Sequence, residues 1–329
     1  MTATLLLTRS DVADLLDLDT CITAVEAAFR LHGQGDAHTG VLGVHVEGGG
    51  FHIKAGTLHL RRHYFAAKTN ANFPNNPAKG LPTIQGVIVL ADADVGTPLA
   101  LLDSMEITTL RTGAASAVAA KYLAREDART VGLIGCGNQG WVQLRALRRV
   151  RPLTSARVYD REQGRAEQLA RKLAAELGLE IEVSSDPSAA ARNSDIVVTC
   201  TSAREPILGV GDVAPGTFVA AVGADNPEKH EIAPALLAAS RVVVDVLDQA
   251  ATMGDLHHAI AAGVMTRSDV AAELGQIVAG RLPKAGRQSP DEVIIFDSTG
   301  MALQDVAAAA AVYERAQAAG RGTLVHLAS

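Results

Sequence analysis

The chain has 329 residues, of which 48% are hydrophobic and 20% charged, and its formal net charge is −6. This composition indicates a folded globular protein and excludes general disorder, while the length favours two domains over one. The dispersed charges argue against a nucleic-acid-binding protein, which needs a basic face. Three scattered cysteines are too few for a disulfide scaffold or a zinc site, so no metal is expected. We find no apolar run long enough to span a membrane and no signal-peptide pattern, and therefore expect a cytoplasmic protein.

The first third of the sequence predicts one helix followed by short strands. Residues 11–32 have helical periodicity, and Asp19 or Thr20 is the expected cap of that helix. Because no helical pattern separates the strands that follow, we expect them to pair antiparallel. These β-like runs are at 41–46, 51–55, 64–68, 86–92 and 98–103.

From about residue 112 the pattern changes to strands that alternate with helices. An alanine-rich helix is predicted at 112–124 and a long final helix at 300–320. Apolar strands are predicted between them at 130–135, 156–160, 181–185, 195–201, 217–224, 241–246 and 293–298. Such strands are typical of a parallel sheet covered on both faces. The expected fold class is α/β: a Rossmann-type doubly wound parallel sheet and a second α+β domain with antiparallel strands.

A glycine-rich turn follows the first of these strands. Gly135, Gly137 and Gly140 form the pattern G-x-G-x-x-G at the start of a helix. In dinucleotide sites the first glycine permits a tight turn, the second lets backbone approach the pyrophosphate, and the third lets the helix pack on the strand. We predict a dinucleotide site that includes Asn138 and Gln139. The alternative is a glycine-rich turn without a ligand.

Asp160 indicates which dinucleotide to expect. It ends the next strand, where a carboxylate can accept hydrogen bonds from both ribose hydroxyls and repel a 2′-phosphate. Arg161 is the contrary observation, because an arginine beside this position can hold a 2′-phosphate. We therefore predict NAD, with NADP as the alternative.

Motifs along most of the chain occur in the order of one known family. They are FAAKTNANFPNNPAKGLPTIQG (65–86), D-x-x-x-G-x-P-L-A-L-L-D (92–103), T-x-L-R-T-G-A-A-S-A-V-A-A-K-Y-L-A (108–124), V-G-A-D-N-P-E-K-H-E-I (222–232) and D-S-T-G-M-A-L-Q-D-V-A (297–307). With the glycine-rich turn, they resemble the ornithine cyclodeaminase/μ-crystallin family, which also contains archaeal-type alanine dehydrogenases and ketimine reductases. The resemblance implies a substrate-binding and dimerisation domain (1–112 with 303–329), an NAD-binding domain (113–302) and a homodimer.

The resemblance also implies roles for single residues. Lys68 matches the family lysine at the reacting centre, Arg111 the arginine that pairs with the substrate carboxylate, and Asp225 the acid that faces the reacting amine. The μ-crystallin-like members lack that aspartate, so Asp225 favours an enzyme. Without the resemblance, Lys68 could be a surface lysine, Arg111 a solvated residue before a helix, and Asp225 a turn former. The segments that line the cofactor in relatives contain Thr83, Thr112, Thr201, Val222 and Ser298.

Two departures from the family pattern bear on the substrate. Many relatives have an arginine and an M-P-A motif before the lysine strand, whereas this sequence has no arginine there and reads K-A-G at 54–56. Lys54, His45 or His52 could supply the missing cation. The cyclodeaminases also have a glutamate shortly before the lysine, and none occurs at 52–60. This favours a substrate without a distal ammonium.

The expected chemistry is hydride transfer at Cα of a small L-amino acid or its imine. Lys68 with a lowered pKa would act as a base, and Lys68 and Arg111 would converge on a nicotinamide held by the glycine-rich turn. Three functions stay open. They are an NAD-dependent amino-acid dehydrogenase or imine reductase, an ornithine- or lysine-type cyclodeaminase that recycles NAD, and a non-enzymatic μ-crystallin-like binding protein.

Overall fold

The chain divides into two compact units. The computed structural model describes residues 3–282 and 285–327. Unit 1 comprises Met1–Arg111 with Met301–Ser329, and unit 2 comprises Thr112–Gly300. No helix in the described part of the chain is long and apolar enough to cross a membrane.

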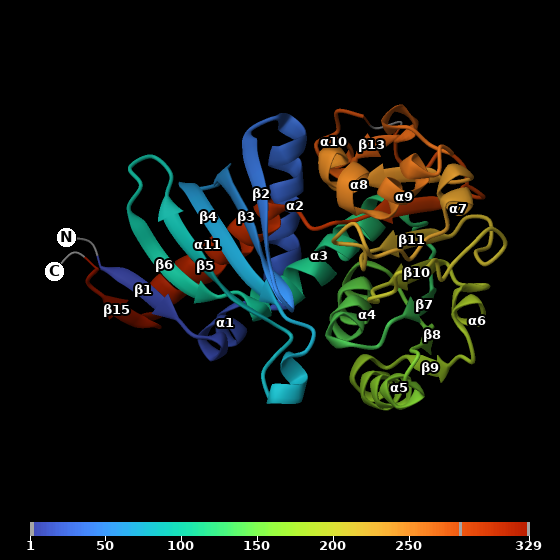
Figure 1. Cartoon of the computed structure of the whole chain (residues 1–329), viewed down its shortest axis with the longest axis horizontal. Coiled ribbons are helices and arrows are strands. Elements are labelled where there is room, and N and C mark those ends of the chain that lie inside the picture. The colour runs from blue at the N-terminus through green and yellow to red at the C-terminus, as the bar shows by residue number, and fades with distance from the viewer. Residues whose placement is uncertain (1–2, 283–284, 328–329) are drawn as a thin grey trace. The chain divides into compact units, whose positions relative to one another are not determined.

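Unit 1 is built on a seven-stranded sheet with the order β15-β1-β6-β5-β4-β3-β2 (Figure 1). Neighbouring strands are antiparallel, except that β1 and β6 are parallel. The strands are β1 (Thr4–Leu7), β2 (Ala37–Val46), β3 (Gly49–His59), β4 (His63–Asn72), β5 (Ile84–Asp92), β6 (Pro98–Asp103) and β15 (Thr323–Val325). The predicted antiparallel domain is confirmed, while β1 and β15 were not expected from the sequence.

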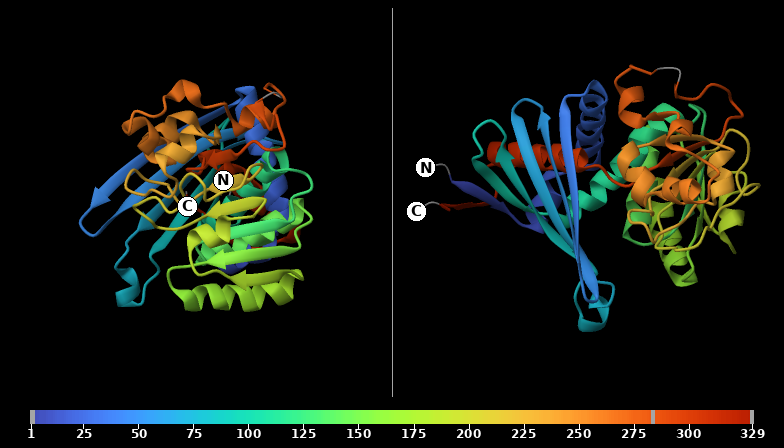
Figure 2. Two further views of the ribbon diagram at one scale, coloured as in Figure 1. Left: turned by 90° about the vertical axis from the view of Figure 1, so that its right-hand side faces the viewer. Right: turned by 45° about the horizontal axis from the view of Figure 1, so that its top comes forward.

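Helices cover one face of this sheet. They are α1 (Arg9–Leu15), α2 (Leu18–Gln34) and α11 (Ala302–Ala319). α11 packs on α2 and lies along β3 and β4 (Figure 2). Successive side chains of a strand point to opposite faces, so on β4 Tyr64, Ala66 and Lys68 are buried while the residues between them are partly exposed. Lys68 therefore belongs to the face that α11 covers.

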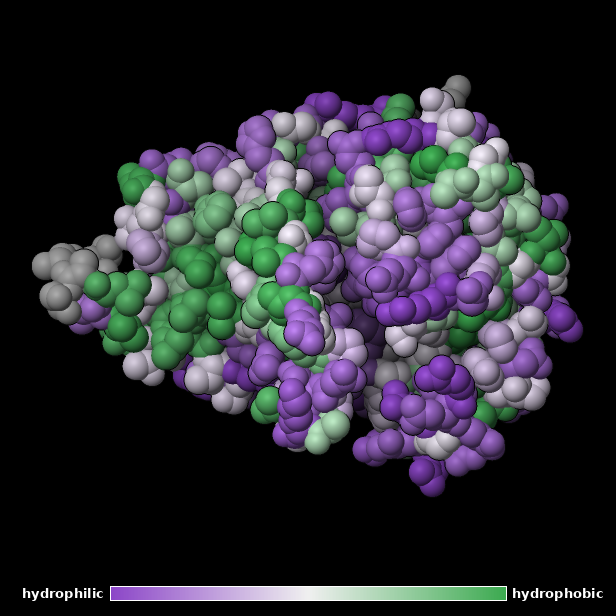
Figure 3. All heavy atoms as spheres, in the orientation of Figure 1, coloured by the Kyte–Doolittle hydropathy of each residue, from purple (hydrophilic) through white to green (hydrophobic). Residues whose placement is uncertain are grey.

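The opposite face of the sheet is apolar and exposed. Leu42 and Val44 on β2 lie opposite Ile53 and Phe51 on β3. Leu42, Val44 and Phe51 are all exposed. On β5 the exposed Val87 alternates with the buried Ile88. Figure 3 shows hydrophobic residues gathered over the strands of unit 1.

The prediction of a single helix over residues 11–32 is wrong, because the chain forms two helices there, α1 and α2. Leu16 has an extended backbone, and the Asp17 carboxylate accepts a hydrogen bond from the Thr20 N–H at 2.7 Å. Asp17 is thus the cap, rather than Asp19 or Thr20, because its side chain satisfies a free N–H at the start of α2. A short polar residue with the right geometry restarts the helix one turn later.

Helix α3 (Met105–Leu123) also begins earlier than the expected 112. Asp103 accepts hydrogen bonds from the N–H groups of Met105 and Glu106, which supports the first turn. Arg111 therefore lies inside a helix and is buried, and the reading of Arg111 as a solvated residue before a helix is wrong.

Unit 2 is built on an eight-stranded sheet with the order β13-β12-β14-β11-β10-β7-β8-β9, in which every pair is parallel (Figure 1). The strands are β7 (Thr130–Ile134), β8 (Ser155–Tyr159), β9 (Glu180–Val183), β10 (Ile196–Thr199), β11 (Phe218–Ala221), β12 (Arg241–Val244), β13 (Ala272–Glu273) and β14 (Ile294–Asp297). Strands β10, β11 and β14 are buried along their whole length, because helices pack on both faces. The predicted α/β fold class is confirmed.

The helices of unit 2 are mostly short. They are α4 (Asn138–Val150), α5 (Gln163–Leu177), α6 (Pro187–Ala191), α7 (Pro234–Ala238), α8 (Leu247–Met253), α9 (Asp255–Ala261) and α10 (Leu274–Val278). The strand order runs outward in both directions from β7 and β10, so the topology reverses beside the start of α4. Ligands of open parallel sheets bind at such a point, outside the carboxyl ends of the strands.

Candidate active site

Three buried charged side chains of unit 1 form a cluster of ion pairs. Lys68 Nζ on β4 lies 2.8 Å from Asp305 Oδ2 on α11, and Arg111 Nε on α3 lies 3.2 Å from Asp305 Oδ1. Lys68 is 3% exposed, Arg111 7% and Asp305 1%. A single carboxylate, which the sequence analysis did not single out, therefore brings the two predicted cations together.

Gln304 completes this cluster. It is fully buried beside Asp305 in the first turn of α11, and its Oε1 accepts a hydrogen bond from Arg111 Nη1 at 3.0 Å. Within the described residues its Nε2 is buried and has no hydrogen-bond partner. Buried polar groups are normally hydrogen-bonded, so this amide is a candidate donor to an oxygen of a ligand.

The charges around Lys68 set its protonation. Burial lowers the pKa of Lys68 to about 7, although Asp305 raises it; Arg111 and Lys54 lower it further. Burial alone would raise the pKa of Asp305, but Lys68 and Arg111 outweigh it and hold that pKa below its ordinary value. A lysine of this kind is available as a neutral amine near neutral pH and can exchange a proton with a bound molecule.

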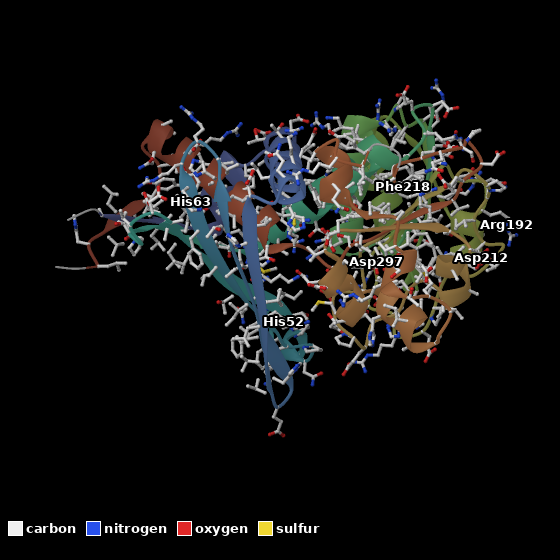
Figure 4. All side chains as sticks on the ribbon, turned by 90° about the horizontal axis from the view of Figure 1, so that it is seen from above. His52, His63, Arg192, Asp212, Phe218 and Asp297 are labelled. Atoms are coloured by element: carbon white, nitrogen blue, oxygen red, sulfur yellow. The ribbon has the colours of Figure 1, made fainter. Side chains whose placement is uncertain are left out.

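Of the three residues proposed as the missing cation, Lys54 is the one whose charge reaches the cluster. It lies directly opposite Lys68 in the β3–β4 register, on the same face of the sheet. His52 pairs with Asn70 further along β3 (Figure 4), and His45 is exposed on β2 opposite Gly50. The described residues contain no group of three His, Cys, Asp or Glu side chains that could hold a metal ion.

The glycine-rich turn of unit 2 has the geometry that its spacing predicts. Gly135 has φ +105°, and a Cβ there would lie 2.8 Å from the carbonyl oxygen of Cys200. A Cβ on Gly140 would lie 2.3 Å from the Gly135 oxygen, so the third glycine is needed where α4 packs on β7. A Cβ on Gly137 would meet no atom within 4 Å, and no side chain caps the start of α4 there. The N–H groups at this open end fit the pyrophosphate of a dinucleotide.

Asp160 lies beside this turn, just after β8. Its Oδ2 accepts a hydrogen bond from the Cys136 N–H at 2.8 Å, and its Oδ1 accepts one from the Glu162 N–H at 2.9 Å. The carboxylate is thus oriented at the position where relatives of this fold bind a ribose. Arg161 is exposed, as is Asn138, whereas Gln139 is half-buried in the first turn of α4.

The other residues predicted to line the cofactor are divided between the units. In unit 2, Thr201, Val222 and Ser298 follow the carboxyl ends of β10, β11 and β14. Ser298 Oγ donates to Asp245, so this hydroxyl is used inside the protein. The remaining two are Thr112, on α3 in unit 2, and Thr83, between β4 and β5 in unit 1.

Unit 2 also contains four buried carboxyl groups that the sequence analysis missed: Glu231, Asp245, Asp255 and Asp297, the last labelled in Figure 4. Glu231 Oε1 accepts hydrogen bonds from both the N–H and the Oγ1 of Thr201, at 2.6 and 2.7 Å. Its Oε2 accepts from the Gly223 N–H at 2.8 Å. Glu231 therefore fixes the segments that follow β10 and β11, at the edge where a dinucleotide would bind.

Asp225 lies in an exposed segment after β11. Its Oδ1 is 2.7 Å from Lys229 Nζ and accepts a hydrogen bond from Asn226 Nδ2. Because Asp225 belongs to unit 2 and Lys68 to unit 1, its part in a common site stays a prediction.

Comparison with known proteins decides the family. Residues 2–320 match the model of the ornithine cyclodeaminase/mu-crystallin family. The chain belongs to this family. It is 40% identical to an alanine dehydrogenase of Archaeoglobus fulgidus over 95% of both chains. An archaeal alanine dehydrogenase dimer with bound NAD superimposes with a TM-score of 0.94, at 38% identity, covering 99% of this chain and 100% of the other. The Thermococcus litoralis Δ1-pyrroline-2-carboxylate reductase, solved with NADH and L-proline, gives a TM-score of 0.93 at 36% identity, covering 98% and 100%.

In this ornithine cyclodeaminase/mu-crystallin protein, one motif contained the residues that the sequence analysis overlooked. Gln304 and Asp305 lie in D-S-T-G-M-A-L-Q-D-V-A, at the start of an otherwise apolar helix. Two polar residues within such a helix were a usable signal, because a buried aspartate normally has a charged or hydrogen-bonded partner. The sequence did not indicate that the partners of Asp305 would be Lys68 and Arg111.

Proposed function

We propose that the protein is an NAD-dependent oxidoreductase that transfers hydride at Cα of a small L-amino acid or its imine. The observation that carries the proposal is the buried cluster in which Lys68 and Arg111 share Asp305. A base and a carboxylate-binding cation side by side suit a substrate whose nitrogen and carboxylate flank one carbon. The similarity to an alanine dehydrogenase and to a pyrroline-2-carboxylate reductase over nearly the whole chain supports this substrate class.

Arg111 and Gln304 would bind the substrate carboxylate. Arg111 uses Nε and Nη1 for Asp305 and Gln304, so Nη2 is the nitrogen it would direct to the substrate. The unpartnered Nε2 of Gln304 offers a second donor. Charge-assisted hydrogen bonds of this kind are short and strong, and they would fix the orientation of Cα.

Lys68 would transfer the proton. In the oxidative direction the substrate amine must be neutral before hydride leaves Cα, and the neutral amine of Lys68 would accept the proton of the substrate ammonium. In the reductive direction the Lys68 ammonium would return it. We assign Asp225 to the stabilisation of the positively charged iminium.

The glycine-rich turn and Asp160 would hold the cofactor, which supplies the hydride acceptor or donor when bound. The N–H groups at the start of α4 would bind the pyrophosphate, and Asp160 would bind the ribose hydroxyls in preference to a 2′-phosphate. This favours NAD over NADP.

We further propose that a second copy of the chain covers the exposed apolar face of the unit 1 sheet. Exposed contiguous apolar surface commonly marks an interface, and a similar alanine dehydrogenase is a dimer. Sedimentation of the purified protein tests this, because a stable monomer at micromolar concentration would contradict it.

The deciding experiment follows NADH by absorbance with L-alanine, other small L-amino acids and cyclic imines, in both directions. We expect turnover with at least one of them, and Lys68→Ala should lower kcat/KM by about 10²–10⁴-fold, the usual contribution of a general base. Lys172→Ala, an exposed lysine on α5, is the matched control and should retain activity. No turnover with any substrate would contradict the proposal. Ammonia and a cyclic amino acid formed from ornithine or lysine without net NADH would show a cyclodeaminase instead.

A further inference from the structure

The carboxylate of Asp305 is the centre of the buried charge cluster. Its two oxygens face different cations, Lys68 at 2.8 Å and Arg111 at 3.2 Å. These cations come from β4 and α3, which are far apart in sequence, whereas Asp305 comes from α11 near the end of the chain. Asp305 is therefore the contact that sets the distance and direction between the two groups.

We propose, on the basis of the function above, that Asp305 is a positioning residue that holds the Lys68 amine and the Arg111 guanidinium at a fixed separation for one substrate. Asp305 uses both oxygens inside the protein, so it acts through these two residues. Because each oxygen forms an ion pair with a different cation, the carboxylate restrains the positions of both. The substrate then meets a carboxylate-binding group and a base already set at the spacing of its own carboxylate and nitrogen.

Asp305 has a second effect, on the proton of Lys68. The charged groups that face Lys68 are Lys54 on β3, Arg111 on α3 and Asp305 on α11; the thiol of Cys21 on α2 also lies within the field of Arg111 and Asp305. Among them Asp305 is the anion, and it stabilises the Lys68 ammonium against burial and two neighbouring cations. Without Asp305 the lysine would be neutral over a wider pH range, and the carboxylate that aims it would be absent.

Two properties separate this role from simple structural support. A buried ion pair is weak evidence for stability, since replacing both of its partners by apolar residues of similar volume is often neutral or stabilising. A positioning residue must instead change how Lys68 titrates and how fast the reaction proceeds. Both can be measured independently of the free energy of unfolding.

The experiment compares Asp305→Asn with the unsubstituted protein by two readouts. In the pH profile of kcat/KM for oxidation, the acidic limb should move to lower pH by about one unit or more, because an opposite charge at this distance shifts a pKa by about 1–3 units. The Nζ resonance of Lys68, observed by nitrogen NMR of isotope-labelled lysine and assigned by its loss in Lys68→Arg, should titrate at correspondingly lower pH. The kcat should fall more than KM changes.

Asp92→Asn is the matched control. Asp92 is also a buried carboxylate of unit 1, but it lies on β5 opposite Tyr64 and pairs with Arg62, which precedes β4, so its replacement should leave the Lys68 titration unchanged. If Asp305→Asn does not fold, Asp305→Glu keeps the charge and moves it by one methylene. That variant should retain the acidic limb and lose kcat.

The inference is overturned if Asp305→Asn titrates as the unsubstituted protein does, or if Asp305→Glu keeps full kcat. The NMR titration needs no substrate. It therefore tests the role of Asp305 even if no amino acid or imine proves to be turned over, which would count against the proposed function alone.

Discussion

Buried carboxyl groups occur in both units, and the two units stabilise them in different ways. In unit 1 the Asp305 carboxylate contacts two cations, Lys68 and Arg111. In unit 2 the donors to the buried carboxyl groups are backbone N–H groups and hydroxyls; Asp297, for example, accepts from the N–H groups of Asp255 and Leu256 at the start of α9. Within the described part of unit 2, no lysine or arginine forms an ion pair with these four acids.

The difference teaches that burial alone does not decide the protonation of a carboxyl group. Burial and the neighbouring Asp245 raise the pKa of Asp297 to about 7, despite the two N–H donors. Burial also raises the pKa of Glu231 and, more strongly, that of Asp255. Asp305 is just as deeply buried, yet its pKa is lowered, because two cations outweigh the loss of water.

The largest effect is expected from removing a cation of unit 1. Arg111→Met should lower the free energy of unfolding by about 3–5 kcal/mol, because breaking a buried pair from one side leaves Asp305 with a single cation. Arg145→Met removes an arginine that pairs with Glu176 at the surface, and should cost about 1 kcal/mol or less. Urea denaturation measures both. Equal losses would show that the buried cluster is no more important to stability than a surface pair.

A smaller effect is expected from a carboxyl group of unit 2. Glu231→Gln replaces one acceptor oxygen by an NH₂ group that faces donors, and should lower the free energy of unfolding by about 1.5–3 kcal/mol, the usual contribution of a hydrogen bond to a charged group. It should also weaken NAD binding, because Glu231 holds Thr201 and Gly223 in place. Glu182→Gln, at an exposed position on β9, is the control. A fully stable Glu231→Gln protein with normal NAD affinity would be incompatible with this role.

The most diagnostic effect is the dependence of stability on pH. The folded state binds the proton of Asp297 more tightly than the unfolded state, so this stabilisation is present below about pH 4 and is lost as pH rises through about 7. The folded state binds the proton of Lys68 less tightly, so stability from this group rises between about pH 7 and 10.5. Denaturation midpoints at several pH values should show both slopes. Lys68→Met should remove the alkaline rise, and an unchanged slope above pH 7 in that variant would contradict the assignment.

Much of the fold could be predicted because it depends on short-range patterns. The strands at 64–68 and 86–92 were located from local hydrophobicity, and the structure extends or retains them as β4 and β5. Local patterns failed where a single polar side chain decided a boundary, as Asp17 does before α2 and Asp103 does before α3. They also missed the pairing of β1 with β15, because it joins opposite ends of the chain.

The site was predictable to a different extent in each unit. The glycine-rich turn is contiguous, so its glycines and Asp160 could be proposed as a dinucleotide site from spacing alone. The charge cluster of unit 1 needs residues from three distant segments. Lys68 and Arg111 could be chosen only by resemblance, and the carboxylate that joins them could not be chosen at all.

The sequence by itself determined the alternation of strands and helices, the antiparallel and parallel sheets, and the conformation of the turn at Gly135. These follow from the side-chain period along a helix or strand and from the backbone freedom of glycine. Only the tertiary structure decided that β4, α3 and α11 place Lys68, Arg111 and Asp305 within contact, and that the pKa of Asp305 is lowered whereas that of Asp297 is raised. Contact between distant segments, and the water it removes, are properties of the packed chain.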